Sequence, residues 1–341
     1  MTDAEGPRVM SAGEVADAGA VAGVGEIGTV EAHAKVNLRL RVFARDETGF
    51  HGVETLLART SLSDTVTLSA AGPRGGRPEG RGPTGARSES AGPRDGRSVT
   101  LSVDGPLAEG VPDGPNNLCR QAAERFFERA FGRRRWPAVH IRLTKRIPMG
   151  SGLGGGSADA GATLRLLAAR WPRLETRELV AFAGEIGSDV PFAFLGVPMA
   201  LGWERGRRLL PLRPPRPRPA LLVCPPIHVS TPEAYGWLGR TDEDAGAASV
   251  LPGATRLAEW DSLERLARND LEAPVLARHP ELSELLDGLG SCDPALAAMT
   301  GSGSTLFAIF RDEAERARAR RTLAASDGAE GLRILDVALP V

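Results

Sequence analysis

Apolar and polar residues alternate along residues 29–42, and this alternation predicts one long β-strand or two consecutive strands. Residues 53–69 continue in the same style. Further strands are expected at residues 98–103, 139–143, 220–224, 297–299, 306–310 and 332–337. Apolar residues at helical spacing predict helices over residues 117–131, 157–169, 176–186, 262–288 and 313–325, with Thr176 as the N-cap of the third. Helices mixed with hairpin-like strand pairs indicate an α+β fold.

Composition along the chain indicates two halves. Residues 1–28 lack firm periodicity and are expected to form a disordered extension. Residues 71–97 consist almost entirely of Gly, Pro, Arg, Ser and Ala, so we expect a disordered insertion between strands. The proline-rich segment 211–219 predicts a linker. The expected domains are therefore residues 29–210 and 219–341.

The overall composition is typical of a globular protein of about two domains, with 341 residues, 42% of them hydrophobic and 25% charged. The net charge of -1 gives no basic excess for binding nucleic acid. No apolar run reaches the roughly 18 to 20 residues that a membrane helix needs. Three widely spaced cysteines form no disulfide framework or CxxC metal site, which favours a cytoplasmic location. The oligomeric state is not fixed, and a homodimer stays open.

The basic residues are strongly biased, because 40 of the 42 are arginine and only Lys35 and Lys145 are lysine. Genome bias is the simplest explanation. Lysine nevertheless carries a compact point charge where arginine carries a wide planar fork. Lysines retained in such a sequence therefore suggest tight sites that need an ammonium group.

A glycine-rich segment carries the strongest chemical signal, with five glycines in the seven residues 150–156 and a predicted helix directly after them. Glycines let backbone N–H groups surround an anion, and the helix N-terminus adds its dipole. We favour phosphate binding over a simple glycine turn that caps the helix. The GxGxxG spacing of a dinucleotide-binding oxidoreductase is also present, but a second helix follows instead of a parallel strand. No Gly-Lys-Ser/Thr closes a P-loop.

Polar residues on apolar segments suggest a site, although each has a simpler interpretation. Lys35 and Asn37 lie on one face of the first strand, and periodicity alone favours a solvated face there. Asp189 precedes an apolar stretch and would need a partner such as Lys35, but it could also be a turn residue. Phe50 and His51 could stack on and hydrogen-bond a heterocycle, or form a turn.

Five segments in order, residues 34–38, 49–51, 148–158, 187–191 and 300–303, together resemble the GHMP kinase superfamily. The resemblance covers residues 29–340, without the 71–97 insertion. Segments 49–51 and 187–191 are most similar to the branch that phosphorylates diphosphocytidyl methylerythritol in the non-mevalonate isoprenoid pathway. The resemblance implies a two-domain fold, with an N-terminal ribosomal-protein-S5-like α/β domain and a C-terminal ferredoxin-like α+β domain.

The resemblance also implies roles for individual residues, with ATP and Mg²⁺ as cofactors. Asp189 matches the catalytic base and Lys35 its charge partner. The implied ATP contacts are Asn117, Lys145, Pro148, Met149, Gly150, Ser151, Gly152, Leu153, Gly154, Gly155, Gly156, Ser157 and Ala158. The implied contacts to the cytidyl substrate are Asn37, Phe50, His51, Thr231, Tyr235, Gly301, Ser302 and Gly303. No metal ligand is assigned.

Three positions depart from the family pattern. Phe50 stands where the family usually has Tyr, Tyr235 where it often has Phe, and His33 where it normally has Pro. Both stacking rings are thus kept. Two alternatives remain open: another small-molecule kinase of the superfamily, acting on homoserine or a sugar, and a non-catalytic nucleotide-binding protein of the same fold. Affinity for CMP, and ATP binding without turnover, would distinguish them.

Overall fold

The structure is a computed structural model that describes residues 25–45, 51–70, 98–132, 136–204, 206, 208–239, 253, 255–326 and 330–341. The predicted insertion 71–97 and most of the predicted extension 1–28 lie outside these residues. The end of that extension was predicted wrongly, because the first strand already begins at Glu26. Glu26 pairs with Ser69 and Gly28 with Leu68, so backbone pairing compensates for the weak sequence pattern.

The first sheet is built around two 20-residue strands, β1 (Glu26–Arg45) and β2 (His51–Ala70), which pair antiparallel. The strand order is β3-β4-β2-β1-β8, and β5 pairs with β2 and β6. The other strands are β3 (Val99–Asp104), β4 (Val139–Thr144), β5 (Met199–Trp203), β6 (Arg208–Pro211) and β8 (Arg268–Asn269). The sequence pattern predicted β1 to β4 but missed β5, β6 and β8.

Register shifts interrupt the β1–β2 pairing between His33 and Lys35 and again between Asn37 and Arg39. Such bulges bend a strand and redirect its side chains, and they are frequent next to active sites. All residues from Ala34 to Leu40 are buried, so this part of β1 is covered on both faces. The alternative interpretation, in which Lys35 and Asn37 lie on a solvated face, is therefore wrong.

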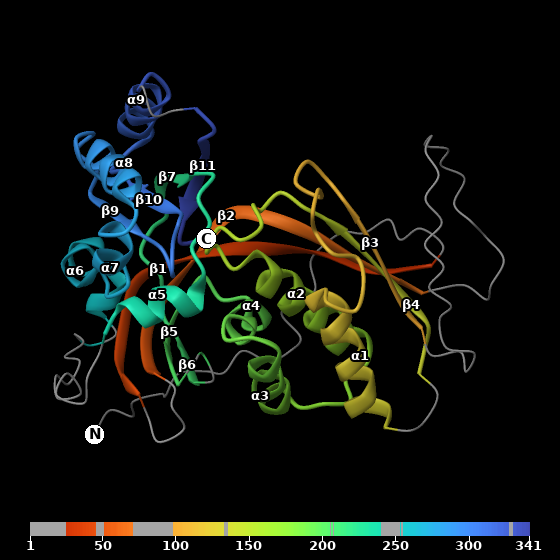
Figure 1. The fold of residues 1–341 in the computed structure, drawn as a ribbon. Coiled ribbons are helices and arrows are strands. Elements are labelled where there is room, and N and C mark those ends of the chain that lie inside the picture. The colour runs from red at the N-terminus through yellow and green to blue at the C-terminus, as the bar shows by residue number, and fades with distance from the viewer. Residues whose placement is uncertain are drawn as a thin grey trace, which may run out of the picture.

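Four helices lie on one face of the first sheet, below the long strands in Figure 1. They are α1 (Leu118–Phe131), α2 (Gly155–Arg170), α3 (Thr176–Ile186) and α4 (Val190–Leu195). Helix α2 contacts both β1 and β2, and α1 and α4 pack on either side of it. The predicted N-cap of α3 was one residue late: Glu175 is the cap, and its backbone N–H donates to the Glu178 carboxylate at 2.8 Å.

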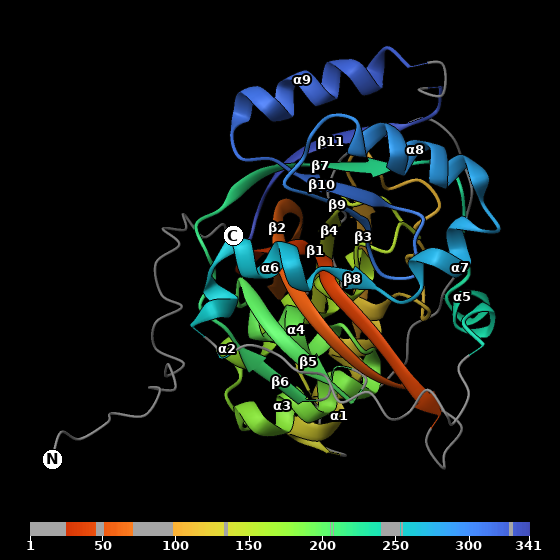
Figure 2. The same ribbon diagram turned by 90° about the vertical axis from the view of Figure 1, so that its left-hand side faces the viewer.

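The second sheet is antiparallel, with the strand order β11-β7-β10-β9. Its strands are β7 (Arg218–Cys224), β9 (Leu296–Met299), β10 (Leu306–Ile309) and β11 (Arg333–Leu339). The helices of this half are α5 (Thr231–Trp237), α6 (Trp260–Leu266), α7 (Glu272–Leu276), α8 (Pro280–Gly290) and α9 (Glu313–Ala324). Helices α8 and α9 cover the outer face of the sheet (Figure 2), which gives a ferredoxin-like arrangement of strands and helices.

The two halves are joined by a linker shorter than the predicted 211–219, because Pro211 belongs to β6 and Arg218 and Pro219 belong to β7, and the halves are not separate bodies. Residues 212–217, between β6 and β7, have no regular secondary structure. Strand β8, from the C-terminal half, pairs in parallel with β1 of the first sheet. One hydrophobic cluster contains Val36 and Leu38 of β1 together with Leu222 of β7 and Phe307 of β10. The shared core fixes the relative position of the halves, and a site between them can be preorganised.

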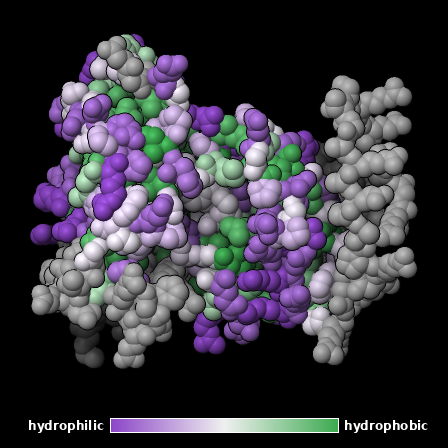
Figure 3. Space-filling model, viewed as in Figure 1, coloured by the Kyte–Doolittle hydropathy of each residue, from purple (hydrophilic) through white to green (hydrophobic). Residues whose placement is uncertain are grey.

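The face shown in Figure 3 carries interspersed hydrophilic and hydrophobic side chains, with only small hydrophobic patches. Among the described residues, no helix is long and apolar enough to cross a membrane.

Candidate active site

Lys35 is held rigidly on β1. Its side chain is 8% exposed, and its Nζ donates to Asn37 Oδ1 at 2.7 Å and lies 3.3 Å from Asp189 Oδ2. The side chain of Asn37 in turn donates from Nδ2 to Thr55 Oγ1 at 2.7 Å. These contacts leave the ammonium group little rotational freedom. The prediction that Lys35 is the partner of Asp189 is confirmed.

Asp189 stands at the N-terminus of the short helix α4, directly after the loop that ends α3. Its side chain is 29% exposed, so the carboxylate is accessible while Lys35 pairs with it. A Cβ atom on Gly154 would lie only 3.1 Å from Lys35 Cε and 3.5 Å from Asp189 Oδ2. The absence of a side chain at Gly154 therefore lets the ion pair approach the glycine loop.

The glycine loop connects β4 to α2 with a backbone that side chains would strain. Gly150, Gly152 and Gly154 have φ of 71°, 78° and 71°, in the left-handed region. At Gly152 a Cβ atom would also lie 2.9 Å from the carbonyl oxygen of Gly303. Helix α2 has no side-chain cap at its N-cap, Gly154, so its first N–H groups are available to an anion.

Two cavities meet at this point. One, of about 330 Å³, is lined by Val111, Pro112, Asn116, Asn117, Leu118, Lys145, Asp159 and residues 148–157. The other, of about 710 Å³, is lined mainly by β1, β2, the start of α4, helix α5 and the β9–β10 turn. Gly152 and Gly154 line both cavities. A phosphorylated molecule in the small cavity and an alcohol in the large one would therefore meet beside Lys35 and Asp189.

Most of the predicted substrate contacts line the large cavity, namely Asn37, His51, Thr231, Tyr235, Gly301 and Ser302. Thr231 and Ser302 are joined by a hydroxyl–hydroxyl hydrogen bond of 2.9 Å. Gly303 does not line it and instead packs behind Gly152. Phe50 lies outside the described residues.

Of the predicted ATP contacts, every residue except Ala158 lines the small cavity. Ala158 is buried in the hydrophobic core, and its N–H closes the first turn of α2 on the Gly154 carbonyl at 2.8 Å. Asn117 lines the cavity, and its side chain also stabilises the N-terminus of α1. Its Oδ1 accepts from Cys119 N at 2.9 Å, as the N-cap of α1, and its Nδ2 donates to the Pro112 carbonyl at 2.8 Å.

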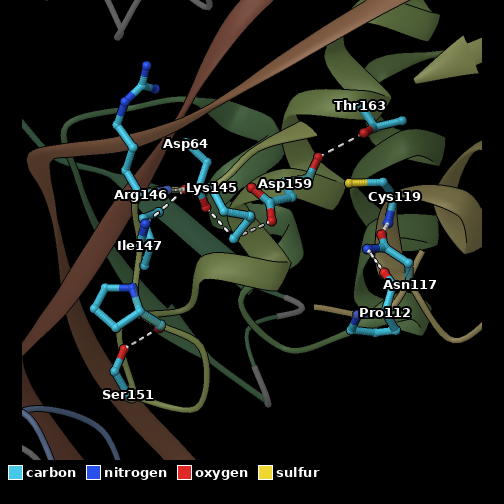
Figure 4. Close-up of polar contacts among 11 residues, drawn as sticks. Asp64, Pro112, Asn117, Cys119, Lys145, Arg146, Ile147, Ser151, Asp159 and Thr163 are labelled. Atoms are coloured by element: carbon cyan, nitrogen blue, oxygen red, sulfur yellow. Dashed lines mark hydrogen bonds and ion pairs between the residues drawn. The ribbon is translucent and has the colours of Figure 1, made fainter. Parts of the chain in front are cut away.

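Lys145, a predicted ATP contact, lines the small cavity but is already paired with two carboxylates. It is 3% exposed, and its Nζ donates to carboxylates of Asp64 and Asp159, at 2.7 Å for Asp159 Oδ2 (Figure 4). Although burial lowers the pKa of Lys145, these two carboxylates raise it more. Both lysines of the chain are thus buried in this region, as their rarity suggested.

Asp64 connects this cluster to the backbone and was missed in the sequence. Its Oδ1 accepts the backbone N–H groups of Arg146 and Ile147, at 2.8 Å for Ile147, where β4 enters the glycine loop. Asp64 shares the buried face of β2 with Val66 and Leu68. The sequence did carry a signal for Asp64, because a carboxylate stands there in a series of alternate positions that are otherwise apolar.

Asp64→Ala should destabilise the fold strongly, because it removes one of the two carboxylates around the buried Lys145 ammonium and leaves the backbone N–H groups of Arg146 and Ile147 without their acceptor. We expect the free energy of unfolding to fall by about 2–5 kcal/mol, since each buried donor left unpaired costs about 1–3 kcal/mol. The matched control is Asp104→Ala, which removes a carboxylate that pairs with Arg142 on the surface; a loss below about 1 kcal/mol is expected there. Urea denaturation measures both, and equal losses would contradict the role of Asp64.

One side of the large cavity carries two rings. The ring centroids of His51 and Tyr235 are 5.8 Å apart, with an angle of 35° between the planes. His51 Nδ1 lies 2.7 Å from the Phe43 carbonyl oxygen. Because a carbonyl only accepts, Nδ1 carries the proton and Nε2 of a neutral ring is an acceptor. Burial and the charge of Asp189 raise the pKa of Tyr235 to about 12, so its hydroxyl stays protonated.

The site therefore combines an accessible carboxylate paired with an ammonium, a backbone anion cradle and an aromatic pocket. This combination suits transfer of a phosphoryl group to an alcohol. Comparison with known proteins identifies the class: residues 117–197 match the family model of the GHMP kinases N terminal domain, and residues 253–328 that of the GHMP kinases C terminal.

Relatives of the whole chain narrow the class. A 4-diphosphocytidyl-2-C-methyl-D-erythritol kinase of Anaeromyxobacter sp. (strain Fw109-5) is 39% identical over 296 residues, which cover 86% of this chain and 85% of the relative. The corresponding kinase of Ruegeria pomeroyi is 33% identical, with 84% and 90% covered. The chain belongs to the 4-diphosphocytidyl-2-C-methyl-D-erythritol kinase family.

Solved structures agree with this assignment. A crystal structure of 4-(cytidine 5'-diphospho)-2C-methyl-D-erythritol kinase superposes with a TM-score of 0.68 and 31% identity, over 92% of this chain and 99% of that one. Homoserine kinase from Cytophaga hutchinsonii gives a TM-score of 0.61 at 16% identity, over 91% and 93%. The second match concerns the fold alone. The predicted α+β fold with two GHMP kinase domains is confirmed.

Proposed function

We propose that this protein transfers the γ-phosphoryl group of MgATP to the 2-hydroxyl of 4-diphosphocytidyl-2-C-methyl-D-erythritol. The observation that carries the proposal is the placement of Lys35 and Asp189 at Gly154, where the two cavities meet. The glycine-loop cavity takes ATP and the large cavity takes the cytidyl substrate. At about 710 Å³ the latter is within the usual range of small-molecule sites.

In the proposed mechanism Asp189 accepts the proton of the attacking hydroxyl. Lys35 holds the carboxylate in place at 3.3 Å and places a positive charge beside the reacting phosphoryl group. The N–H groups at the start of α2 stabilise charge on the phosphate oxygens. Phosphoryl transfer needs little covalent help beyond such positioning and charge.

Mg²⁺ belongs to this proposal as part of the MgATP substrate. The described residues contain no group of three His, Cys, Asp or Glu side chains that could hold a metal ion by themselves. Mg²⁺ usually keeps several waters and binds through substrate phosphates with few protein carboxylates, so this site suits an ion that enters with the nucleotide. Bound there, the ion would neutralise phosphate charge.

The large cavity can distinguish a cytosine ring. His51 Nε2 is an acceptor suited to the exocyclic amine of cytosine, and the Tyr235 ring offers a stacking face. Phe50, predicted from the sequence to stack on the other face of the cytosine, lies outside the described residues, and its role stays a prediction. A homoserine or sugar kinase would need none of these three side chains.

Tyr235→Ala should raise the KM for the cytidyl substrate about tenfold or more while kcat changes little, because base stacking contributes about 1–3 kcal/mol. Tyr235→Phe is the matched control and should behave like the wild type, since it keeps the ring. Steady-state kinetics at saturating MgATP measure both variants. An unchanged KM in the alanine variant would refute the stacking role.

The experiment that tests the function is ADP release by the purified protein with MgATP and each of four acceptors. These are diphosphocytidyl methylerythritol, homoserine, mevalonate and galactose. Turnover on the cytidyl acceptor alone is expected. Turnover on another alcohol would overturn the proposed substrate but leave the assignment as a kinase intact. In that case we would also expect no tight binding of CMP. ATP binding without any turnover would favour a non-catalytic nucleotide-binding protein.

A further inference from the structure

Beneath the glycine loop, the buried cluster of Asp64, Lys145 and Asp159 contains more negative than positive charge. All three side chains are at most 4% exposed. One ammonium group faces two carboxylates, so the cluster carries a net charge of -1 when both are ionised. Lys145 and Asp159 also line the small cavity. An anionic nucleotide would therefore bind beside buried negative charge that nothing in the cluster compensates.

Asp159 is the member of the cluster with an unused oxygen. Its Oδ2 accepts from Lys145 Nζ at 2.7 Å, whereas its buried Oδ1 has no hydrogen-bond partner. Buried polar atoms are normally hydrogen-bonded. Lys145 Nζ donates to one oxygen of each carboxyl group, so the two acids share a single ammonium. A proton on one of them would remove the uncompensated charge. Figure 4 shows the three side chains converging on one point, with Lys145 between the two acids.

The surroundings of Asp159 come from three other elements. Asp64 faces it from β2, Lys145 from the residue after β4, and Cys119 from α1. Burial and the charge of Asp64 outweigh the attraction of Lys145 and raise the pKa of Asp159 to about 8. Burial also raises the pKa of the Cys119 thiol, which stays neutral. Two carboxyls that share one site commonly retain a proton in this way.

We propose that the Asp64–Lys145–Asp159 cluster holds one proton between its two carboxyls, and that a nucleotide binds more tightly while this proton is held. The proposal rests on the nucleotide role proposed for the small cavity. With the proton the cluster is neutral, and without it the negative charge repels the phosphates. By linkage, nucleotide binding must then draw a proton onto the cluster. Asp159 affects nucleotide binding only through the charge of the cluster beside the small cavity, so we regard it as a positioning residue and not as a catalytic one.

The test is calorimetric titration of the wild-type protein with MgADP between about pH 7.5 and about pH 9. Phosphate esters lose their last proton near pH 6, so the nucleotide itself stays ionised throughout. We expect the Kd to rise roughly fivefold across this range, as the pH passes the pKa of the cluster. Two buffers with different ionisation enthalpies should reveal uptake of a fraction of a proton per MgADP near pH 8.

Asp159→Asn keeps the shape of the side chain and fixes it as neutral. We expect this variant to bind MgADP at about pH 7.5 as tightly as the wild type, with a flat pH profile and no proton uptake. The matched control is Glu272→Gln, which neutralises a half-buried carboxylate on α7 that accepts from Met299 N and does not line the small cavity. It should retain the wild-type profile.

The proposal would be overturned if the Kd of the wild type for MgADP did not change with pH, or if Asp159→Asn showed the same pH dependence as the wild type. In either case the binding of MgADP would still support the nucleotide site. A wild-type protein that bound no MgADP at any pH would overturn the proposed nucleotide role and this inference together. The proton count is measured on the unmodified protein, so the test holds even if a variant folds poorly.

Discussion

Asp189→Asn should lower kcat by about 10³-fold while the KM for both substrates changes little. General-base catalysis contributes about 10²–10⁴-fold, and the amide cannot accept the proton of the attacking hydroxyl. Asparagine has nearly the shape of aspartate, and the side chain is partly exposed, so the fold should be unaffected. Rapid-quench measurement of the phosphoryl transfer step would separate this loss from slow product release.

The matched control for this variant is Ser188→Ala. Ser188 lines the same cavity one residue earlier, and the proposed mechanism assigns its hydroxyl no role. It should retain kcat within about threefold, as expected of a polar change outside the reacting groups. Near-normal turnover of Asp189→Asn would remove Asp189 as the base.

Lys35→Arg should lower kcat by about 10²-fold or more, although the formal charge is kept. The wide guanidinium does not fit where Lys35 Cε lies 3.1 Å from the position of a Cβ on Gly154 and Nζ contacts Asn37 Oδ1 at 2.7 Å. An arginine would displace Asp189 or the glycine loop. Steady-state kinetics with a thermal melt would show lost turnover in a folded protein.

Arg142→Lys provides the control for an arginine–lysine exchange. Arg142 lies on β4 with its side chain 63% exposed and pairs with Asp104. This exchange should leave activity unchanged and stability within about 0.5 kcal/mol. A fully active Lys35→Arg protein would contradict the tight ammonium site that the rarity of lysine in this chain suggested.

Most of the regular structure was predictable because local patterns and the fold agree. The alternation in residues 29–42 became β1, and the apolar face of α1 and the apolar helix α2 became part of the helical layer. The misses are elements that tertiary contacts stabilise. Strand β8 has only two residues and exists through its pairing with β1. Helix α4 has six residues, too few for a periodic pattern to indicate it.

The candidate site was predictable in its loops and less so in its buried charges. The glycine loop could be predicted from its composition. The pairing of Lys35 with Asp189 could be predicted because a partly buried carboxylate needs a cation as its partner. That Lys145 would be enclosed by two carboxylates could not be deduced, because Asp64 lies 81 positions away in the chain. Such a contact depends on the β2–β4 pairing, which no local pattern specifies.

The central claim is that the two cavities bring ATP and the cytidyl alcohol together at Asp189. The most direct measurement is ³¹P NMR of the products formed from MgATP and 4-diphosphocytidyl-2-C-methyl-D-erythritol. The account predicts ADP together with one new phosphomonoester on the 2-hydroxyl of the methylerythritol, and no such signal with Asp189→Asn. A phosphoryl group on another hydroxyl, or ATP hydrolysis without transfer to the substrate, would contradict it.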